Sequence, residues 1–157
     1  SDVHDALRDV EWATLFFFIG LFIMVEAVVA VGIIDTVSLA FLDFTGGNLT
    51  YTSLLLIWMS SIASGIIDNI PYTATMIPIV ENLGLALPIM PLWWSLALGA
   101  CLGGNATLVG ASANVVVANL ATRSGYPIGF GTFLRYGLVT TFISLIIASA
   151  YVWLRYL

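Results

Sequence analysis

Long apolar stretches separated by short polar ones dominate the chain from residue 12 onward. Residues 12 to 34 are almost continuously apolar, apart from one threonine, two glycines and Glu26. A helix of this length would measure about 34 Å and would cross the roughly 30 Å hydrocarbon core of a bilayer. The pattern predicts a membrane-spanning helix over residues 12 to 34, preceded by a polar N-terminal segment over residues 1 to 11.

The following stretch, residues 35 to 50, mixes apolar and polar positions at helical spacing. Acidic residues and a serine separate the apolar positions, which is typical of a helix that lies in the membrane interface. The apolar positions at i, i+3, i+4 and i+7 are Val37, Ala40, Phe41 and Phe44. We predict an interfacial helix that ends in a loop at Gly46-Gly47-Asn48.

Two short apolar stretches, 52 to 67 and 72 to 80, flank the polar sequence Asp68-Asn69-Ile70-Pro71. Neither is long enough to cross a bilayer comfortably, and Pro71 would break a continuous helix because it lacks an amide proton. We predict that residues 52 to 82 form a re-entrant helical hairpin, which turns near residues 68 to 71. Non-helical backbone at that depth is tolerated only where protein or a wet cavity covers it.

A second interruption divides the apolar stretch from residue 92 to residue 121. Its middle, residues 103 to 110, reads Gly-Gly-Asn-Ala-Thr-Leu-Val-Gly. Because glycine allows the backbone to leave helical geometry, we predict one spanning helix that is broken at this point. Residues 131 to 156 are predicted to form a terminal spanning helix, so the expected fold is an all-α integral membrane domain.

Composition agrees with a bilayer protein and argues against other classes. The chain is 61% hydrophobic and 8% charged, whereas a soluble domain carries about 25% charged residues. Four arginines and no lysine offer no basic patch for nucleic acid. Motifs for phosphate binding, thiol redox chemistry or hydrolysis are missing from the sequence, so we expect neither an enzyme nor a bound cofactor. Whether the membrane is a plasma, inner or acidic organelle membrane is left open.

Asp68 is the strongest candidate for a functional side chain. A carboxylate inside a bilayer costs at least about 2.5–3.5 kcal/mol on insertion scales and therefore needs a compensating role. Low dielectric favours the protonated form of a carboxylate, and a bound cation favours the ionised form. Asp68 could therefore exchange a proton for a cation. The alternative, which is compatible with this role, is that Asp68 caps the helix that follows it.

Uncharged oxygen atoms accompany Asp68 at both interruptions. Oxygen ligands suit hard cations, whereas the amides at the start of a half-helix favour anions, so both kinds of substrate stay open. The candidate ion-binding residues are Asp68, Asn69, Thr73, Gly104, Asn105, Thr107 and Asn114. A sodium ion is predicted at Asp68, Asn69, Asn105 and Thr107. For Asn114 the alternative is hydrogen bonding between helices, and for the glycines it is close helix packing.

The pairing of the two interruptions indicates transport. Two apolar segments broken by glycine or proline, with polar residues at the breaks, are typical of a transporter site at the bilayer midplane. Re-entrant loops also build channel filters, so an ion channel is the alternative. Glu26, inside the first predicted span, either lines the pathway or faces a polar partner in the bundle.

Two long motifs resemble a known transporter family. They are DNIPYTATMIP over residues 68 to 78 and GGNATLVGASANVV over residues 103 to 116, and DVEWATL over residues 9 to 15 is similar as well. The family is that of the melanosomal P protein and its bacterial relatives, in the arsenite permease and sodium/proton antiporter branch of the ion transporter superfamily. The chain resembles the C-terminal repeat of these proteins.

The resemblance implies a transporter built from two inverted repeats, each with a re-entrant hairpin and a broken helix. It implies a homodimer with an elevator-like motion, in which the N-terminal repeat of the same transporter, or a second copy, completes the site. The residues it places at the broken helix are Asn105, Thr107, Ser112 and Asn114. The expected function is secondary transport of an inorganic ion, by cation/proton exchange or, alternatively, by transport of an anion such as chloride or arsenite.

Overall fold

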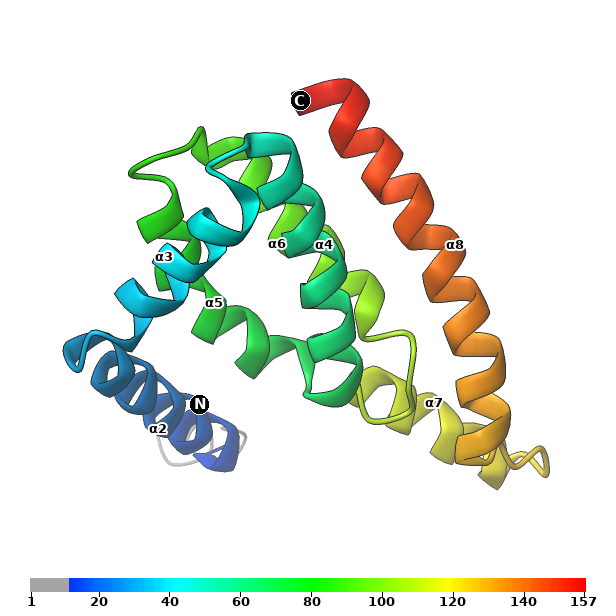
Figure 1. Ribbon diagram of the computed structural model, residues 1–157. Coiled ribbons are helices and arrows are strands. Elements are labelled where there is room, and N and C mark those ends of the chain that lie inside the picture. The colour runs from blue at the N-terminus through cyan, green and yellow to red at the C-terminus, as the bar shows by residue number, and fades with distance from the viewer. Residues whose placement is uncertain (1–11) are drawn as a thin grey trace, which may run out of the picture.

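The computed structural model describes residues 12 to 157, and within them every regular element is a helix, as predicted (Figure 1). The predicted polar segment, residues 1 to 11, lies outside the described residues. In chain order the helices are α2 (Trp12–Ala30), α3 (Ile33–Thr45), α4 (Leu49–Ile66), α5 (Asn69–Leu83), α6 (Ile89–Gly103), α7 (Ser112–Arg123) and α8 (Phe130–Tyr156).

A bend at Gly32 separates α2 from α3. Gly32 has a φ of 76°, in the left-handed region that favours glycine, and the two helices meet at 69°. The bend comes before Ile33 and Ile34, which the sequence pattern assigned to the first span and which instead begin α3. The face of α3 that packs on the bundle carries Ile34, Ser38, Phe41 and Thr45, while Phe44 is exposed.

Helices α4 and α5 are two arms that meet at one end and diverge toward the other (Figure 1). Asn48 caps α4 by accepting a hydrogen bond from the Tyr51 amide, so α4 begins at Leu49, three residues before the predicted start. Helix α5 begins at Asn69, and Pro71 is accommodated in its first turn, where amides lack an intrahelical partner. The arms are joined by Ile67 and Asp68 alone.

Helix α6 packs along α4 with backbone in contact with backbone. A Cβ on Gly99 would lie 2.4 Å from the Ile57 carbonyl oxygen, and one on Gly103 would lie 2.3 Å from the Ser61 carbonyl oxygen. The Ser64 hydroxyl donates a hydrogen bond of 2.6 Å to the Ala100 carbonyl across the same interface. The glycines at positions 99 and 103 therefore serve close helix packing, which requires small residues inside a membrane.

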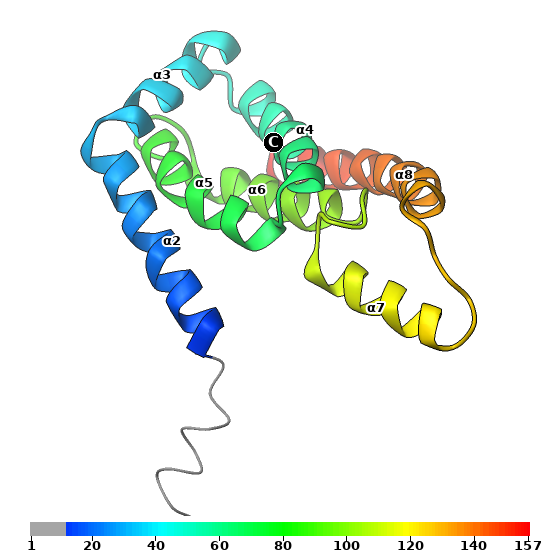
Figure 2. The ribbon, with the colours of Figure 1, turned by 90° about the horizontal axis from the view of Figure 1, so that it is seen from below.

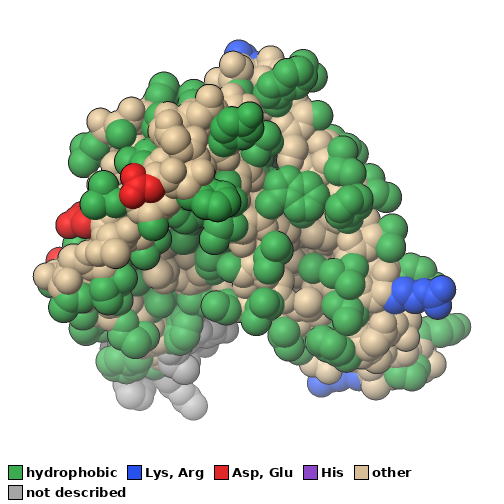
Figure 3. Space-filling view, in the orientation of Figure 1, with side chains coloured by type: hydrophobic (Ala, Val, Ile, Leu, Met, Phe, Trp, Pro, Cys, Tyr) green, Lys and Arg blue, Asp and Glu red, His purple; other side chains and the backbone are tan. Residues whose placement is uncertain are grey.

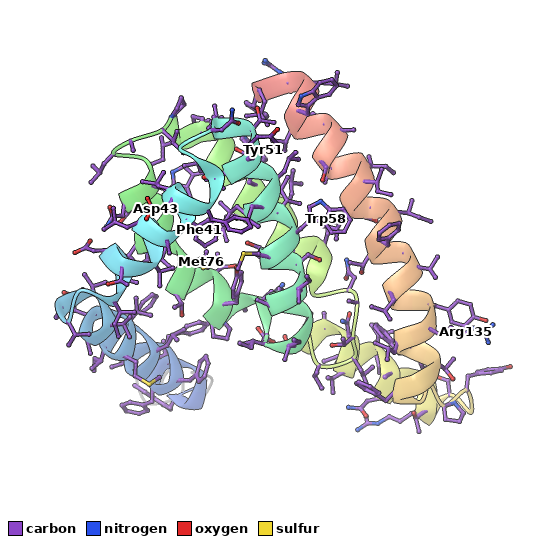
Figure 4. All side chains as sticks on the ribbon, in the orientation of Figure 1. Phe41, Asp43, Tyr51, Trp58, Met76 and Arg135 are labelled. Carbon is purple, nitrogen blue, oxygen red and sulfur yellow. The ribbon has the colours of Figure 1, made fainter. Side chains whose placement is uncertain are left out.

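The core lies between α3, α4, α5 and α6, where Phe41 of α3 and Met76 of α5 are directed into the space between the helices (Figure 4). Helix α8 packs against α6 and α4 through one face. The residues of that face are Gly137, Thr141, Leu145, Ala148 and Val152. Most other α8 side chains are exposed and apolar, and hydrophobic side chains cover much of the molecular face in Figure 3.

Two of the described helices, α4 and α8, are each long and apolar enough to cross a membrane. The bent pair α2 and α3 would supply a third crossing if it acts as one span. Helix α4, which the sequence analysis treated as too short, reaches 18 residues because of its earlier start. In contrast to these, α7 packs against no other described helix and projects away from the bundle (Figure 2).

Candidate functional site

The Asp68 carboxylate joins the start of α5 to the start of α7. Its Oδ1 atom accepts a hydrogen bond of 3.1 Å from the Ile70 amide in the first turn of α5. Its Oδ2 atom accepts a hydrogen bond of 3.2 Å from the amide of Ser112, the first residue of α7. The predicted capping of α5 is therefore confirmed, and the same side chain also contacts a helix that begins 44 residues later.

Polar side chains supply hydrogen bonds to the backbone of the loop between α6 and α7, residues 104 to 111. The Thr107 hydroxyl donates to the Gly65 carbonyl oxygen at 2.5 Å and accepts from the Gly110 amide at 3.0 Å. The Asn114 side-chain amide donates to the carbonyl oxygens of Gly104 and Thr107, at 2.8 and 2.9 Å. Because backbone groups away from water need partners, these two side chains stabilise the loop by completing its hydrogen bonds.

The loop folds back on itself at its two glycines. A Cβ on Gly104 would lie 2.9 Å from the Gly110 carbonyl oxygen, and one on Gly110 would lie 2.8 Å from the Gly104 carbonyl oxygen. The Cβ position on Gly104 is also 3.6 Å from Asn69 Nδ2, so the Asn69 side chain lies against the loop. The hairpin tip and the helix break therefore meet around Asp68, Asn69 and Gly104.

The predicted site residues fall into groups. Asp68, Asn69, Gly104 and Ser112 are brought together, while Thr107 and Asn114 bind backbone groups of the loop and α4. The side chains of Asn69, Thr73 and Ser112 make no hydrogen bond to another residue in the described part of the chain. They are available to a ligand.

Two predicted residues lie outside this meeting point. Asn105 is exposed and lines a separate cavity of about 480 Å³ against the start of α8, together with Tyr136 and Thr140. Glu26 is exposed on α2 and makes no hydrogen bond within the described residues. The four predicted sodium ligands are therefore not gathered in one cluster. Between residues 12 and 157 there is also no group of three or more His, Cys, Asp or Glu side chains that could hold a metal ion.

Sequence reasoning missed the main-chain partners of the site. The Gly65 carbonyl and the Ser112 amide complete the contacts of Thr107 and Asp68, yet neither depends on the identity of a side chain. One available signal was Ala111, which precedes α7 and cannot cap it. A helix that starts without a capping residue needs an acceptor from elsewhere in the fold.

An apolar cavity of about 340 Å³ lies beside the break, between α4 and α8. Trp58 of α4 is directed toward α8 (Figure 4), where its ring meets Phe142 edge to face at a centroid distance of 5.7 Å. Thr107 borders this cavity, but most of its lining is aliphatic or aromatic. A bare ion would find little solvation there.

The apolar helices and the polar breaks between them are those of a multi-pass integral membrane protein of the transporter class. The family described as "Citrate transporter" matches residues 1 to 99. An "Uncharacterized transporter" of Mycobacterium tuberculosis is 51% identical over 156 residues, which cover 97% of this chain and 36% of that protein. The "P protein" of Homo sapiens is 43% identical over 163 residues, which cover 96% of this chain and 20% of that protein. No solved structure matches the chain.

The chain belongs to this citrate transporter family. It spans little more than a third of the length of the mycobacterial relatives that it matches. Membership confirms the resemblance to the P protein, the multi-pass membrane location, and the expectation of a transporter chain and not an enzyme. Assignment to the arsenite permease or antiporter branch stays a prediction.

Proposed function

We propose that the chain is part of a secondary active transporter that exchanges an inorganic cation, such as sodium, for protons. The ion site would lie where the hairpin tip meets the helix break. The observation that supports this most is the position of the Asp68 carboxylate, which lies between two helix starts and beside side-chain oxygens that have no other partner. One carboxylate that binds either a proton or a cation is sufficient for exchange.

The hydrogen bonds of Asp68 favour a cation over an anion. An anion at a half-helix start would be held by free backbone amides. Here the amides of Ile70 and Ser112 already donate to Asp68, so an incoming anion would have to displace a carboxylate. A cation instead gains an ionised carboxylate, and the side-chain oxygens of Asn69 and Ser112 could complete its shell.

The proposed architecture is one inverted repeat, in which α4 and α5 form a re-entrant hairpin and α6 and α7 form a broken helix. The N-terminal repeat of the same transporter, or a second copy, would supply the other wall of the site. A homodimer in the lipid bilayer is the proposed assembly. The exposed apolar surface and the unpartnered α7 leave room for such neighbours.

An anion is the second candidate substrate, and the description of the family as "Citrate transporter" favours it. A carboxylate-bearing substrate would then compete with Asp68 for the two amides. For an anion transporter, Asp68→Asn would remove the carboxylate that competes with the substrate, and anion transport would be maintained or increased. For a cation/proton exchanger, the same substitution would abolish exchange.

The test uses a full-length transporter that carries this sequence, reconstituted into liposomes with a pH-sensitive dye inside. We expect sodium, lithium or potassium gradients to change the internal pH, and Asp68→Asn to abolish the change. Asp35→Asn is the matched control, because Asp35 is also a carboxylate bonded across two helices, to Asn82, but lies away from the tip. Normal cation/proton exchange by Asp68→Asn would refute the role of Asp68. Flux of citrate or chloride would favour the second candidate function. A downhill ion current that is not coupled to proton movement would indicate a channel.

A further inference from the structure

Helix α7 begins without a capping group of its own. The preceding residue is Ala111, which has extended backbone with φ −150° and ψ 137°, and its side chain makes no capping hydrogen bond. Alanine is among the poorest residues for this position. The exposed amide of Ser112 is satisfied instead by Asp68, which already caps α5. Two helices therefore share one capping carboxylate.

The other hydrogen bonds near α7 do not attach it to the hairpin arm α5. Asn114 binds the carbonyls of Gly104 and Thr107, which belong to the loop just before α7. Thr107 attaches that loop to the end of α4 through Gly65. Since α7 packs against no other described helix, the Asp68–Ser112 hydrogen bond is the direct link between α7 and the start of α5.

The charge of Asp68 matters for this link. Each helix start carries a partial positive charge of about +0.5 elementary charge, so the starts of α5 and α7 repel each other unless an anion lies between them. The ionised carboxylate of Asp68 supplies that anion and accepts one hydrogen bond from each helix. A neutral side chain removes the attraction and leaves two like charges close together.

We propose that Asp68 is a positioning residue for α7: its ionised carboxylate fastens the start of α7 to the start of α5, and α7 moves away from the hairpin when that carboxylate is lost. The proposal concerns the position of a helix and holds whichever ion is carried. It goes beyond the proposed function, in which Asp68 is a ligand.

The link can be removed without changing Asp68. Proline is favoured at the first position of a helix, where its fixed φ suits the turn and its missing amide is not needed by the helix. The extended backbone of Ala111 is also the conformation that proline requires of the residue before it. Ser112→Pro therefore deletes the amide that binds Asp68 and keeps the helix, while Ser112→Ala keeps the amide and serves as its control.

The experiment measures the distance between spin labels by pulsed electron paramagnetic resonance, in the full-length transporter in nanodiscs. The labels are placed at the exposed positions Met59 of α4 and Leu120 of α7, in a background free of other cysteines that includes Cys101→Ser. We expect one narrow distance distribution for the parent and Ser112→Ala, and a broader or shifted one for Ser112→Pro and Asp68→Asn. Asp68→Glu, which keeps the carboxylate, should restore the narrow distribution.

One further pair of labels and one further variant test whether the role of Asp68 is purely structural. Labels at Met59 and Ala97, on the tightly packed α4 and α6, should report one distance in every variant, which shows that the bundle is folded. Ala111→Ser supplies a local cap to α7 that carries no charge and therefore does not replace the anion between the two helix starts. If adding it to Asp68→Asn returns the narrow distribution, Asp68 is only a helix cap and the proposal is wrong.

The distance is read without any transport measurement, so the two proposals can fail separately. An unchanged distribution in Ser112→Pro and Asp68→Asn refutes the positioning role, even if Asp68→Asn loses exchange. A changed distribution in a transporter that shows no cation/proton exchange supports the positioning role and refutes the proposed function alone.

Discussion

Helices α6 and α7 are held in position in opposite ways. Helix α6 touches α4 along its backbone at Gly99 and Gly103, so its position is set by many short contacts. Helix α7 packs against no other described helix and is placed by a loop and a few hydrogen bonds from polar side chains. Dense packing resists movement, whereas a few polar contacts can be broken singly. The first region is therefore a rigid frame, and the second is an element that can move when one contact is lost.

The largest effect is expected at Gly103. A Cβ there would lie 2.3 Å from the Ser61 carbonyl oxygen and 2.4 Å from its Cα, both backbone atoms that cannot rotate away. We expect Gly103→Ala to destabilise the fold by about 3 kcal/mol or more, because α6 would have to separate from α4. Thermal unfolding of the purified protein, followed by size-exclusion chromatography, measures the change. Gly131→Ala is the control, since a Cβ there meets nothing within 4 Å. Equal destabilisation by both substitutions would contradict the claim that close contact at Gly103 fixes α6 against α4.

Thr107→Val is expected to have the next largest effect. Valine keeps the shape of threonine but leaves the Gly65 carbonyl and the Gly110 amide without their partner. Each unsatisfied group costs about 1–3 kcal/mol, so the loop should open and ion binding should weaken. Calorimetric ion titration and thermal unfolding test this. Thr140→Val, which removes a hydroxyl bonded only to Tyr136 of its own helix, should leave both measurements close to the parent.

Asn114→Ala should have a smaller, more local effect. It removes the two hydrogen bonds to the carbonyls of Gly104 and Thr107, at about 1 kcal/mol each. We expect amide hydrogen exchange to speed up over residues 104 to 111 while exchange in α4 and α6 stays slow. Asn119→Ala is the control, because Asn119 is an exposed asparagine of the same helix that makes no side-chain hydrogen bond within the described residues. Faster amide hydrogen exchange throughout α6 would show that the loop cannot open without also loosening the α4–α6 interface.

The smallest effect is expected at Glu26. Its side chain is exposed on α2, and among the described helices α2 contacts α3 and α5 but not α7. We expect Glu26→Gln to change the rate of ion transport less than twofold, which is within about 0.4 kcal/mol of the parent barrier. Flux in liposomes measures this rate. A loss comparable to that of Asp68→Asn would place Glu26 in the ion pathway and extend that pathway to α2.

Prediction from the sequence succeeded where one local property dominates. Run lengths of apolar residues identified the helices, and glycine and proline marked their interruptions, although α4 began three residues early because Asn48 caps it. It succeeded less well where several segments must meet. Asn105 and Thr107 are two residues apart, yet one lines a cavity with α8 and the other bonds to α4. Side-chain direction in irregular backbone does not follow from residue spacing.

By itself, the sequence determined that this is an all-helical membrane protein with polar breaks at residues 68 and 103 to 110. It could do so because each helix in lipid must make its backbone hydrogen bonds within its own segment. The apolar length and the polar interruptions of a segment can therefore be recognised from that segment alone. Only the tertiary structure decided that one carboxylate caps two helices. The partners Asp68 and Ser112 are 44 residues apart, and the acceptor binds a backbone amide that any residue except proline would provide. No local pattern can record such a contact.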